Sequence, residues 1–224
     1  MAKLIVALDV DRLSRAEKLV GLLYPEVKIF KVGSQLFTLY GPRAVKMVRK
    51  KGADVFLDLK FYDIPNTVAN AVAAAVRLRV AMLTLHIQGG REMMRRAVEA
   101  RDKEKNRLGI AAPLILGITL LTSSNKRGKI ERYVLSQAGR AKDADLDGVV
   151  ASVAGAGAIR DEFGSGFVTV SPGVRPPGTG VDDHKSSATP RQARRAGADY
   201  IVVGRPVLEA HNPRQVVDDI LNSI

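Results

Sequence analysis

The sequence contains no cysteine and no tryptophan among its 224 residues, and aromatic residues make up only 5%. Without cysteine the chain can form no disulfide, no thiolate metal site and no thiol nucleophile. Its three histidines leave few ligands for zinc. The longest nearly apolar run, residues 109–121, spans about 13 residues and includes Pro113, whereas a membrane-spanning helix needs about 20. These absences exclude a disulfide scaffold, a thiol enzyme and a membrane-spanning helix.

The composition predicts one globular domain over residues 1–224. Hydrophobic residues (46%) and charged residues (26%) are spread along the whole length, which supplies a core and argues against disorder. No linker rich in Pro, Gly or Ser divides the chain. The first residues pass directly into the apolar run 4–8, without a stretch typical of a signal peptide, so we expect a cytoplasmic protein.

Lysine and arginine outnumber aspartate and glutamate by 35 to 23, which gives a formal net charge of +12. A clustered excess of this sign attracts nucleic-acid phosphates. Here the basic residues fall in helical stretches such as 46–51 and 91–96, where they alternate with apolar residues as on a solvated helix face. We therefore expect neither nucleic acid nor membrane as a partner. A basic nucleic-acid binder stays a rival function, which salt-dependent retention of duplex DNA would support.

Short β-branched runs alternate with segments whose apolar residues have helical spacing. Dividing the length by eight gives about 28 residues per unit, enough for a strand, a helix and two short loops. The pattern predicts an α/β protein, a single-domain (β/α)8 TIM barrel whose strands are buried on both faces. In such a barrel the active site lies at the carboxyl ends of the strands. The predicted strands are 3–8, 27–32, 54–59, 81–86, 113–119, 148–151, 167–170 and 200–203.

Charged residues occur at the carboxyl ends of the first three predicted strands. Asp9 follows the first strand and Lys31 lies in the second. Asp58 and Lys60, two residues apart in the third, are expected to share one face and point into the barrel mouth. Charges in a low-dielectric interior must be paired, so these residues are either a salt-bridged plug or a catalytic network. Their arrival from three different strands favours catalysis.

A phosphate site is predicted at the ends of the last two strands. Gly173 permits a close approach of the backbone, and Arg175 offers a bidentate guanidinium. Gly204 and Arg205 open the last predicted helix, where free N–H groups and the helix dipole favour an anion. The stretch 172–189, rich in Pro, Gly, Asp and Ser, is long for a βα loop and predicts a mobile phosphate-binding lid.

Five motifs, in order along the whole chain, resemble the orotidine 5'-phosphate decarboxylase family, with the spacing of its bacterial-type members. The most specific is the stretch Asp-x-Lys-x-x-Asp-Ile-Pro-Asn-Thr, which begins at Asp58. The motifs are Ala-Leu-Asp-Val at 7–10, Lys-Val-Gly at 31–33, the segment 56–68, Ser-Pro-Gly-Val-Arg at 171–175 and Val-Gly-Arg-Pro at 203–206.

The resemblance implies a cofactor-free decarboxylation of orotidine 5'-phosphate to uridine 5'-phosphate. It places an alternating Lys-Asp-Lys-Asp network at Lys31, Asp58, Lys60 and Asp63, the last contributed by the partner subunit of a homodimer. Lys60 is then the proton donor, because a fixed ammonium stabilises the developing carbanion and protonates it. Asp58 is expected beside the substrate carboxylate, where it also holds Lys60 in place.

The same resemblance implies how the substrate is bound. Asp9 and Lys31, together with Asp63 and Thr67 from the other subunit, are expected to bind the ribose hydroxyls. Thr122 corresponds to a position near the pyrimidine, while Arg175, Gly204 and Arg205 hold the phosphate. No metal is implied.

Three positions depart from the family pattern. Tyr62 replaces a usual His and is expected to change only local packing. His184 replaces a lid Gln that bridges pyrimidine and phosphate, and an imidazole differs in reach and can titrate. Ser186 replaces a common Arg in the lid. Separately, His86 at the end of the fourth predicted strand fits either a catalytic or a structural role.

Two other enzyme classes compete with this interpretation. A magnesium-dependent sugar-phosphate decarboxylase or aldolase of the same barrel superfamily shares Asp-x-Lys-x-x-Asp. It places a carboxylate metal ligand where this chain has Lys31, whose positive charge repels magnesium. A Schiff-base aldolase would use Lys60 or Lys31 as its nucleophile, but a lysine between carboxylates is a poor one.

Overall fold

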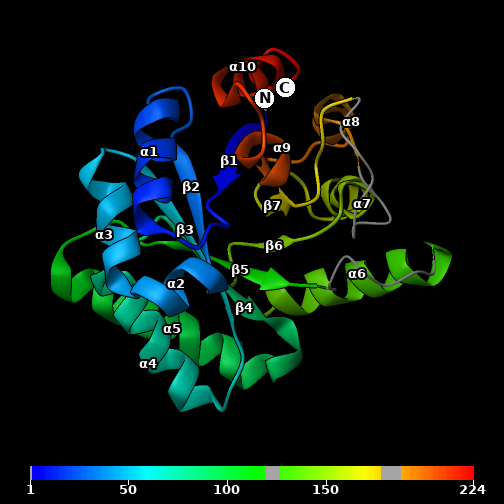
Figure 1. The fold of residues 1–224 in the computed structure, drawn as a ribbon. Helices are drawn as coiled ribbons and strands as arrows, with labels where there is room; N and C mark the ends of the chain where they lie inside the picture. The colour runs from blue at the N-terminus through cyan, green and yellow to red at the C-terminus, as the bar shows by residue number, and fades with distance from the viewer. Residues whose placement is uncertain (1, 120–126, 178–187) are drawn as a thin grey trace.

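The computed structural model describes residues 2–119, 127–177 and 188–224, and Figure 1 shows the path of the chain. Two predicted substrate-binding residues, Thr122 and His184, lie outside the described residues, as does much of the predicted lid 172–189. None of the helices within the three described ranges is long and apolar enough to cross a membrane.

Eight parallel strands close into a barrel. Each strand pairs with its neighbours in the sequence, and β8 returns to pair with β1. The strands are β1 (Lys3–Ala7), β2 (Ile29–Gly33), β3 (Asp54–Phe61), β4 (Met82–His86), β5 (Leu114–Ile118), β6 (Gly148–Val150), β7 (Val168–Ser171) and β8 (Tyr200–Val203). Each one overlaps a predicted run, which confirms the (β/α)8 barrel.

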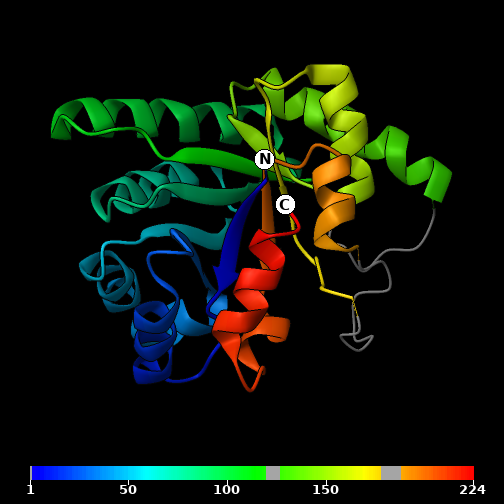
Figure 2. The same cartoon turned by 90° about the horizontal axis from the view of Figure 1, so that it is seen from above.

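Helices alternate with the strands and lie outside the barrel (Figures 1 and 2). Two helices instead of one follow β2, because Gly41, with a φ of +53°, ends the first and Pro42 begins the second. Two also follow β8, the second capped by Asn212. The helices are α1 (Leu13–Leu23), α2 (Ser34–Tyr40), α3 (Pro42–Lys50), α4 (Pro65–Arg77), α5 (Gly90–Leu108), α6 (Arg127–Lys142), α7 (Val153–Phe163), α8 (Pro190–Arg195), α9 (Arg205–Leu208) and α10 (Pro213–Leu221), with a 3₁₀ turn η1 (Ile87–Gly89).

Alternate residues of the strands belong to two buried layers. One hydrophobic cluster fills the barrel, and the other lies between the barrel and the helices. In β1, Ile5 and Ala7 belong to the inner cluster, whereas Leu4 and Val6 belong to the outer one. Both faces of the strands are therefore apolar, as predicted. The inner cluster is Ile5, Ala7, Ile29, Phe56, Met82, Leu116, Val170 and Val202.

The same alternation brings charged residues to the mouth of the barrel. Asp9 lies two residues beyond the inward-facing Ala7. Asp58 likewise lies two residues beyond Phe56, and Lys31 lies two residues beyond Ile29 of β2. The inner layer thus changes from hydrocarbon to charge within one repeat of the strand.

Candidate active site

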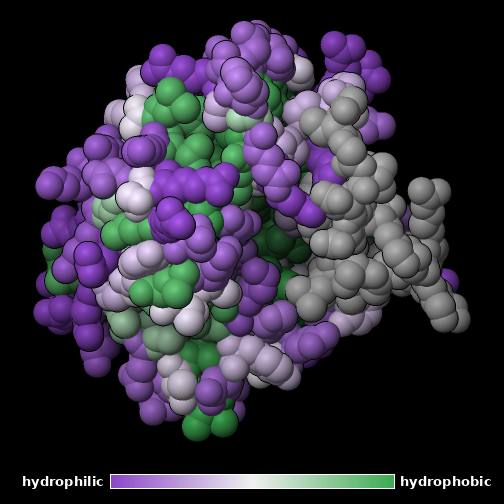
Figure 3. Space-filling view, viewed as in Figure 1, coloured by the Kyte–Doolittle hydropathy of each residue, from purple (hydrophilic) through white to green (hydrophobic). Residues whose placement is uncertain are grey.

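A cavity of about 360 Å³ lies at the carboxyl ends of the strands. Figure 3 shows a hollow in this face of the molecule, with hydrophobic residues inside it and mostly hydrophilic residues around it. The apolar part of the cavity lining includes Ala7, Phe56, Ile118, Val170 and Val202. Its charged residues and glycines are those predicted from the sequence, namely Asp9, Lys31, Asp58, Lys60, Gly173, Arg175, Gly204 and Arg205.

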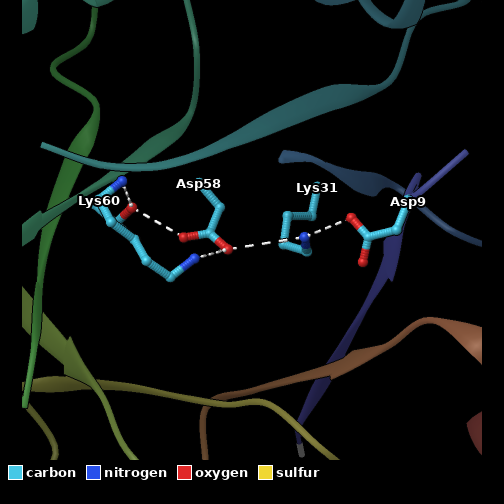
Figure 4. A network of polar contacts seen from close by, with 5 residues as sticks. Asp9, Lys31, Asp58 and Lys60 are labelled. Atoms are coloured by element: carbon cyan, nitrogen blue, oxygen red, sulfur yellow. Dashed lines mark hydrogen bonds and ion pairs between the residues drawn. The ribbon is translucent and has the colours of Figure 1, made fainter. Parts of the chain in front are cut away.

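Four of these side chains form a line of alternating charge across β1, β2 and β3 (Figure 4). The Lys31 Nζ lies 2.8 Å from Asp9 Oδ1 and 3.7 Å from Asp58 Oδ2. Lys60 Nζ lies 2.8 Å from the same Asp58 oxygen. The two central side chains, Lys31 and Asp58, are each only 12% exposed, so their pairing compensates for the loss of hydration.

Gly33, the last residue of β2, leaves room for this network. A Cβ atom at this position would lie 2.8 Å from Lys31 Nζ and 3.1 Å from Asp9 Oδ1. The absence of a side chain at Gly33 therefore allows the Lys31 ammonium to reach Asp9.

The backbone of β3 differs from the regular alternation that the sequence predicted. The strand pairs with β4 at Phe56 and Leu57 and again only at Phe61, with a shift of register between them. Within this irregular stretch Lys60 has a φ of +54°, a left-handed conformation that costs a non-glycine residue about 1–3 kcal/mol. Asp58 and Lys60 share the face at the barrel mouth, as predicted, but they meet there through a bulged backbone and not through a regular two-residue repeat.

Thr84 of β4 contacts this bulge and was missed in the sequence analysis. Its side chain is fully buried. The Thr84 hydroxyl donates a hydrogen bond to Asp58 Oδ1 at 2.9 Å and accepts one from the Lys60 N–H at 2.9 Å. The available signal was a single polar residue inside the apolar run Met82–Leu85.

Asp63 and Thr67 lie apart from the line of charges. Both are exposed, and the Asp63 carboxylate accepts a hydrogen bond from the N–H of Ile64 at 2.6 Å. Asp63 forms no ion pair with any other described residue. Beside it, Tyr62 and Ile64 are 61% and 66% exposed. The single chain therefore joins three members of the predicted Lys-Asp-Lys-Asp network and leaves the fourth on the surface.

The predicted phosphate residues line the cavity after β7 and β8, and β8 is the neighbour of β1, so that a Cβ at Gly204 would lie 3.8 Å from Asp9 Oδ2. Gly173 has a φ of +74°, and Arg175 is buried, with its N–H bonded to the carbonyl of Ala188 at 2.9 Å. Arg205 begins α9, which has only four residues and is followed by the separate helix α10. The expectation that Arg205 opens the last helix was wrong, and a helix of one turn has little dipole to attract an anion.

His86 ends β4, close to the charged line. Partial burial lowers the pKa of its imidazole from the ordinary 6.5, and the Lys60 ammonium lowers it further, against the opposing effect of Asp58. The His86 and Tyr62 rings lie 5.5 Å apart between centroids. His86 is absent from the cavity lining among the described residues, so the geometry favours its structural interpretation.

Within residues 2–119, 127–177 and 188–224 no group of three or more acidic or histidine side chains is arranged to hold a metal ion. The two carboxylates in the described lining of the cavity are Asp9 and Asp58, and Lys31 Nζ lies between them.

Comparison with known proteins connects this geometry to a family. The model of the orotidine 5'-phosphate decarboxylase / HUMPS family matches residues 2–220. Orotidine 5'-phosphate decarboxylase of Geotalea daltonii is 45% identical over 100% of this chain and 96% of its own, and that of Moorella thermoacetica is 48% identical over 94% and 87%. The crystal structure of orotidine 5'-phosphate decarboxylase from Lactobacillus acidophilus superposes with a TM-score of 0.86 at 33% identity, covering 100% of this chain and 99% of that one. This chain belongs to the orotidine 5'-phosphate decarboxylase / HUMPS family.

Proposed function

We infer that this chain decarboxylates orotidine 5'-phosphate to uridine 5'-phosphate and CO2, a reaction of UMP biosynthesis. The relatives described above carry the name of this activity. The observation in the structure that supports it best is the Lys60 ammonium, held 2.8 Å from Asp58 in a cavity that also contains Arg175 and Arg205. One side of the cavity thus offers a fixed proton donor, and another offers two guanidinium groups for a phosphate.

The chemistry follows from the charge that the reaction develops. When the bond between the ring carbon and the carboxylate breaks, CO2 leaves and the electron pair stays on a carbon with no conjugated electron sink. A fixed ammonium beside that carbon stabilises the pair and then gives it a proton, after which water returns a proton to the amine. We assign this role to Lys60. Asp58 is assigned a position beside the substrate carboxylate, where it also holds Lys60 in place. Asp9 and Lys31 are assigned to the ribose hydroxyls.

The alternative of a magnesium-dependent sugar-phosphate enzyme is not supported. Lys31 Nζ lies 2.8 Å from Asp9 and 3.7 Å from Asp58, so an ammonium already occupies the space between the cavity carboxylates. A divalent cation added there would meet a like charge at short range.

An ultraviolet assay that follows the loss of orotidine 5'-phosphate absorbance, with and without a chelator, tests the activity directly. We expect equal rates in both conditions. Lys60→Ala should lose at least about 10³-fold in kcat, about 4 kcal/mol of transition-state stabilisation. The matched control Lys51→Ala removes a lysine that pairs with Glu17 outside the cavity and should keep full activity. No absorbance loss with the wild-type chain, or near-normal turnover of Lys60→Ala, contradicts the proposal.

The proposal includes a homodimer in which Asp63 and Thr67 reach the partner's site. It is supported by the exposure of Asp63 without an ion pair among the described residues and by the exposed apolar side chains of Tyr62 and Ile64 next to it. The proposal also includes one domain over the whole chain, a cytoplasmic location, and no partner of nucleic acid or membrane. The lid role of residues 172–189, and the roles of Thr122 and His184, stay predictions.

Subunit complementation tests the shared site. If each site combines Lys60 from one chain with Asp63 from the other, inactive Lys60→Ala and Asp63→Asn proteins should regain activity when refolded together. With random pairing about half of the dimers are mixed, and one of their two sites has both native residues, which gives about a quarter of wild-type activity. Mixed dimers identified by mass spectrometry but no more active than the parents would place Asp63 in its own chain's site.

A further inference from the structure

Thr84 connects the two residues that the proposed reaction depends on most. The carboxylate of Asp58 uses its two oxygens differently, with Oδ2 facing Lys60 and Lys31 and Oδ1 accepting the hydroxyl of Thr84. The same hydroxyl accepts the main-chain N–H of Lys60. One buried oxygen therefore contacts the side chain of Asp58 and the backbone of Lys60 at 2.9 Å each.

These two bonds fall where the barrel has lost its regular pairing. Because β3 and β4 shift register between Leu57 and Phe61, the Lys60 N–H bonds to the Thr84 side chain instead of a strand carbonyl. A buried N–H without a partner would cost about 1–3 kcal/mol, and a left-handed lysine adds strain of its own. The Thr84 hydroxyl gives the Lys60 N–H a partner and so removes the cost of an unpaired donor. The same bond holds Lys60 in its left-handed conformation.

We propose that Thr84 is a positioning residue for the proton donor. Its hydroxyl fixes the rotation of the Asp58 carboxylate and the backbone of Lys60 together, and in this way sets where the Lys60 ammonium lies in the cavity. This inference rests on the proposed function, since it gives Thr84 a role in proton donation by Lys60. Small displacements of a reacting group are enough to matter, because a misplacement of about 1 Å can cost about 100-fold in rate.

The chain contains a matched control for a purely structural role. Thr169 of β7 is also fully buried, donates its hydroxyl to Asp199 Oδ2 at 3.2 Å and accepts the Asp199 N–H at 3.3 Å. Neither residue is part of the cavity lining among the described residues. Thr169→Val and Thr84→Val thus each remove a buried hydroxyl that bonds to an aspartate carboxylate and to a main-chain N–H, in one case beside the proton donor and in the other away from it. The Asp199 N–H also bonds to the main-chain carbonyl of Thr169 at 3.2 Å, so Thr169→Val leaves it a partner.

The experiment measures kcat, KM and thermal midpoint for Thr84→Val, Thr84→Ser and Thr169→Val. We expect Thr84→Val to lower kcat about 10- to 100-fold while KM changes less than about threefold. Thr84→Ser keeps the hydroxyl and should stay within about threefold of wild-type kcat. Thr169→Val should lower the thermal midpoint by no more than Thr84→Val does, because the Asp199 N–H keeps its main-chain partner, and it should keep kcat within about twofold. In a Lys60→Ala background, Thr84→Val should slow turnover far less than it slows the wild type, because the two act together.

The possible outcomes separate the proposed decarboxylase function from the positioning role of Thr84. A wild-type chain that leaves orotidine 5'-phosphate unchanged overturns the proposed function and this inference with it. An active wild type with an equally active Thr84→Val, or with a Thr169→Val that loses just as much kcat, overturns the inference alone. If Thr84→Val does not fold, Thr84→Ala, which also removes the hydroxyl, takes its place. A kcat lowered about 10- to 100-fold with an Asp58–Lys60 pair displaced in its crystal structure supports the inference, and an unchanged kcat, or a Thr84→Ser enzyme that loses as much kcat as Thr84→Ala, overturns it.

Discussion

Replacing Gly33 with alanine places a methyl group against the charged network while leaving every charged residue in the sequence. The backbone at Gly33 has φ −94° and ψ −176°, extended values that alanine adopts without strain. The new Cβ would lie 2.8 Å from Lys31 Nζ, so the ammonium has to retreat by about 0.6 Å to reach ordinary contact at 3.4 Å. This displacement disturbs the ion pair between Lys31 Nζ and Asp9 Oδ1, which lie 2.8 Å apart. Asp9 Oδ1 would itself lie 3.1 Å from the new methyl group.

The expected loss follows from the contact that is disturbed. A hydrogen bond between charged groups contributes about 1.5–3 kcal/mol, which corresponds to about 10- to 100-fold in kcat/KM if the Lys31–Asp9 pair is needed to bind the ribose. Stability should fall by no more than the same amount, about 1.5–3 kcal/mol, because the atom that must move is the end of a flexible side chain and not the backbone. Gly33→Ala is therefore predicted to fold normally and to work poorly.

The assay pairs kcat/KM for orotidine 5'-phosphate with urea unfolding, and Gly21→Ala is the control. Gly21 lies in α1, and a methyl group added to it would meet no atom within 4 Å beyond its chain neighbours and the backbone of its own helix. Alanine there should therefore add up to about 1 kcal/mol of stability and leave kcat/KM unchanged. A Gly33→Ala enzyme within twofold of wild-type kcat/KM would refute the steric reasoning. An activity loss that only tracks a loss of folded protein would refute it as well.

Three further outcomes are expected. Arg205→Ala should mainly raise KM for the nucleotide, and turnover of the phosphate-free nucleoside should be insensitive to it. Burial and the nearby Lys60 ammonium lower the pKa of His86, so its imidazole binds protons more readily in the unfolded state. The free energy of unfolding should therefore fall as the pH drops below about 6.5, and urea titrations of His86→Asn should show a smaller fall. Hydrogen bonds from Arg107 and Arg77 lower the pKa of Glu104 to about 2, so the destabilisation of Glu104→Gln seen by urea unfolding at pH 7 should shrink as the pH falls from 4.5 towards 2.

The sequence predicted those parts of the fold that depend on periodic patterns. The eight strands and the apolar character of both strand faces follow from the short β-branched runs, and the inward direction of Asp9, Lys31 and Asp58 follows from the two-residue repeat of a strand. These signals are local, and the barrel repeats them eight times.

The parts that the sequence did not predict depend on how one strand meets another. A register shift between β3 and β4 is a property of the pair, so neither the left-handed Lys60 nor its bond to Thr84 has a signature in one strand alone. The early end of α9 has a local signal in Asn212 and Pro213, which begin a new helix and were overlooked. The proposed role of Asp63 and Thr67 in a partner's site depends on a second chain, which no pattern within one chain describes.

The change from hydrocarbon to charge inside the barrel also shapes the electric field of the site. Phe56 lies one strand repeat, about 7 Å, below Asp58, and the rest of the inner cluster continues beneath it. Hydrocarbon polarises far less than water, so this layer is a low-dielectric wall behind the lysines and screens their charge very little. Such a wall directs the field lines of Lys60 into the cavity, where a bound anion would meet them.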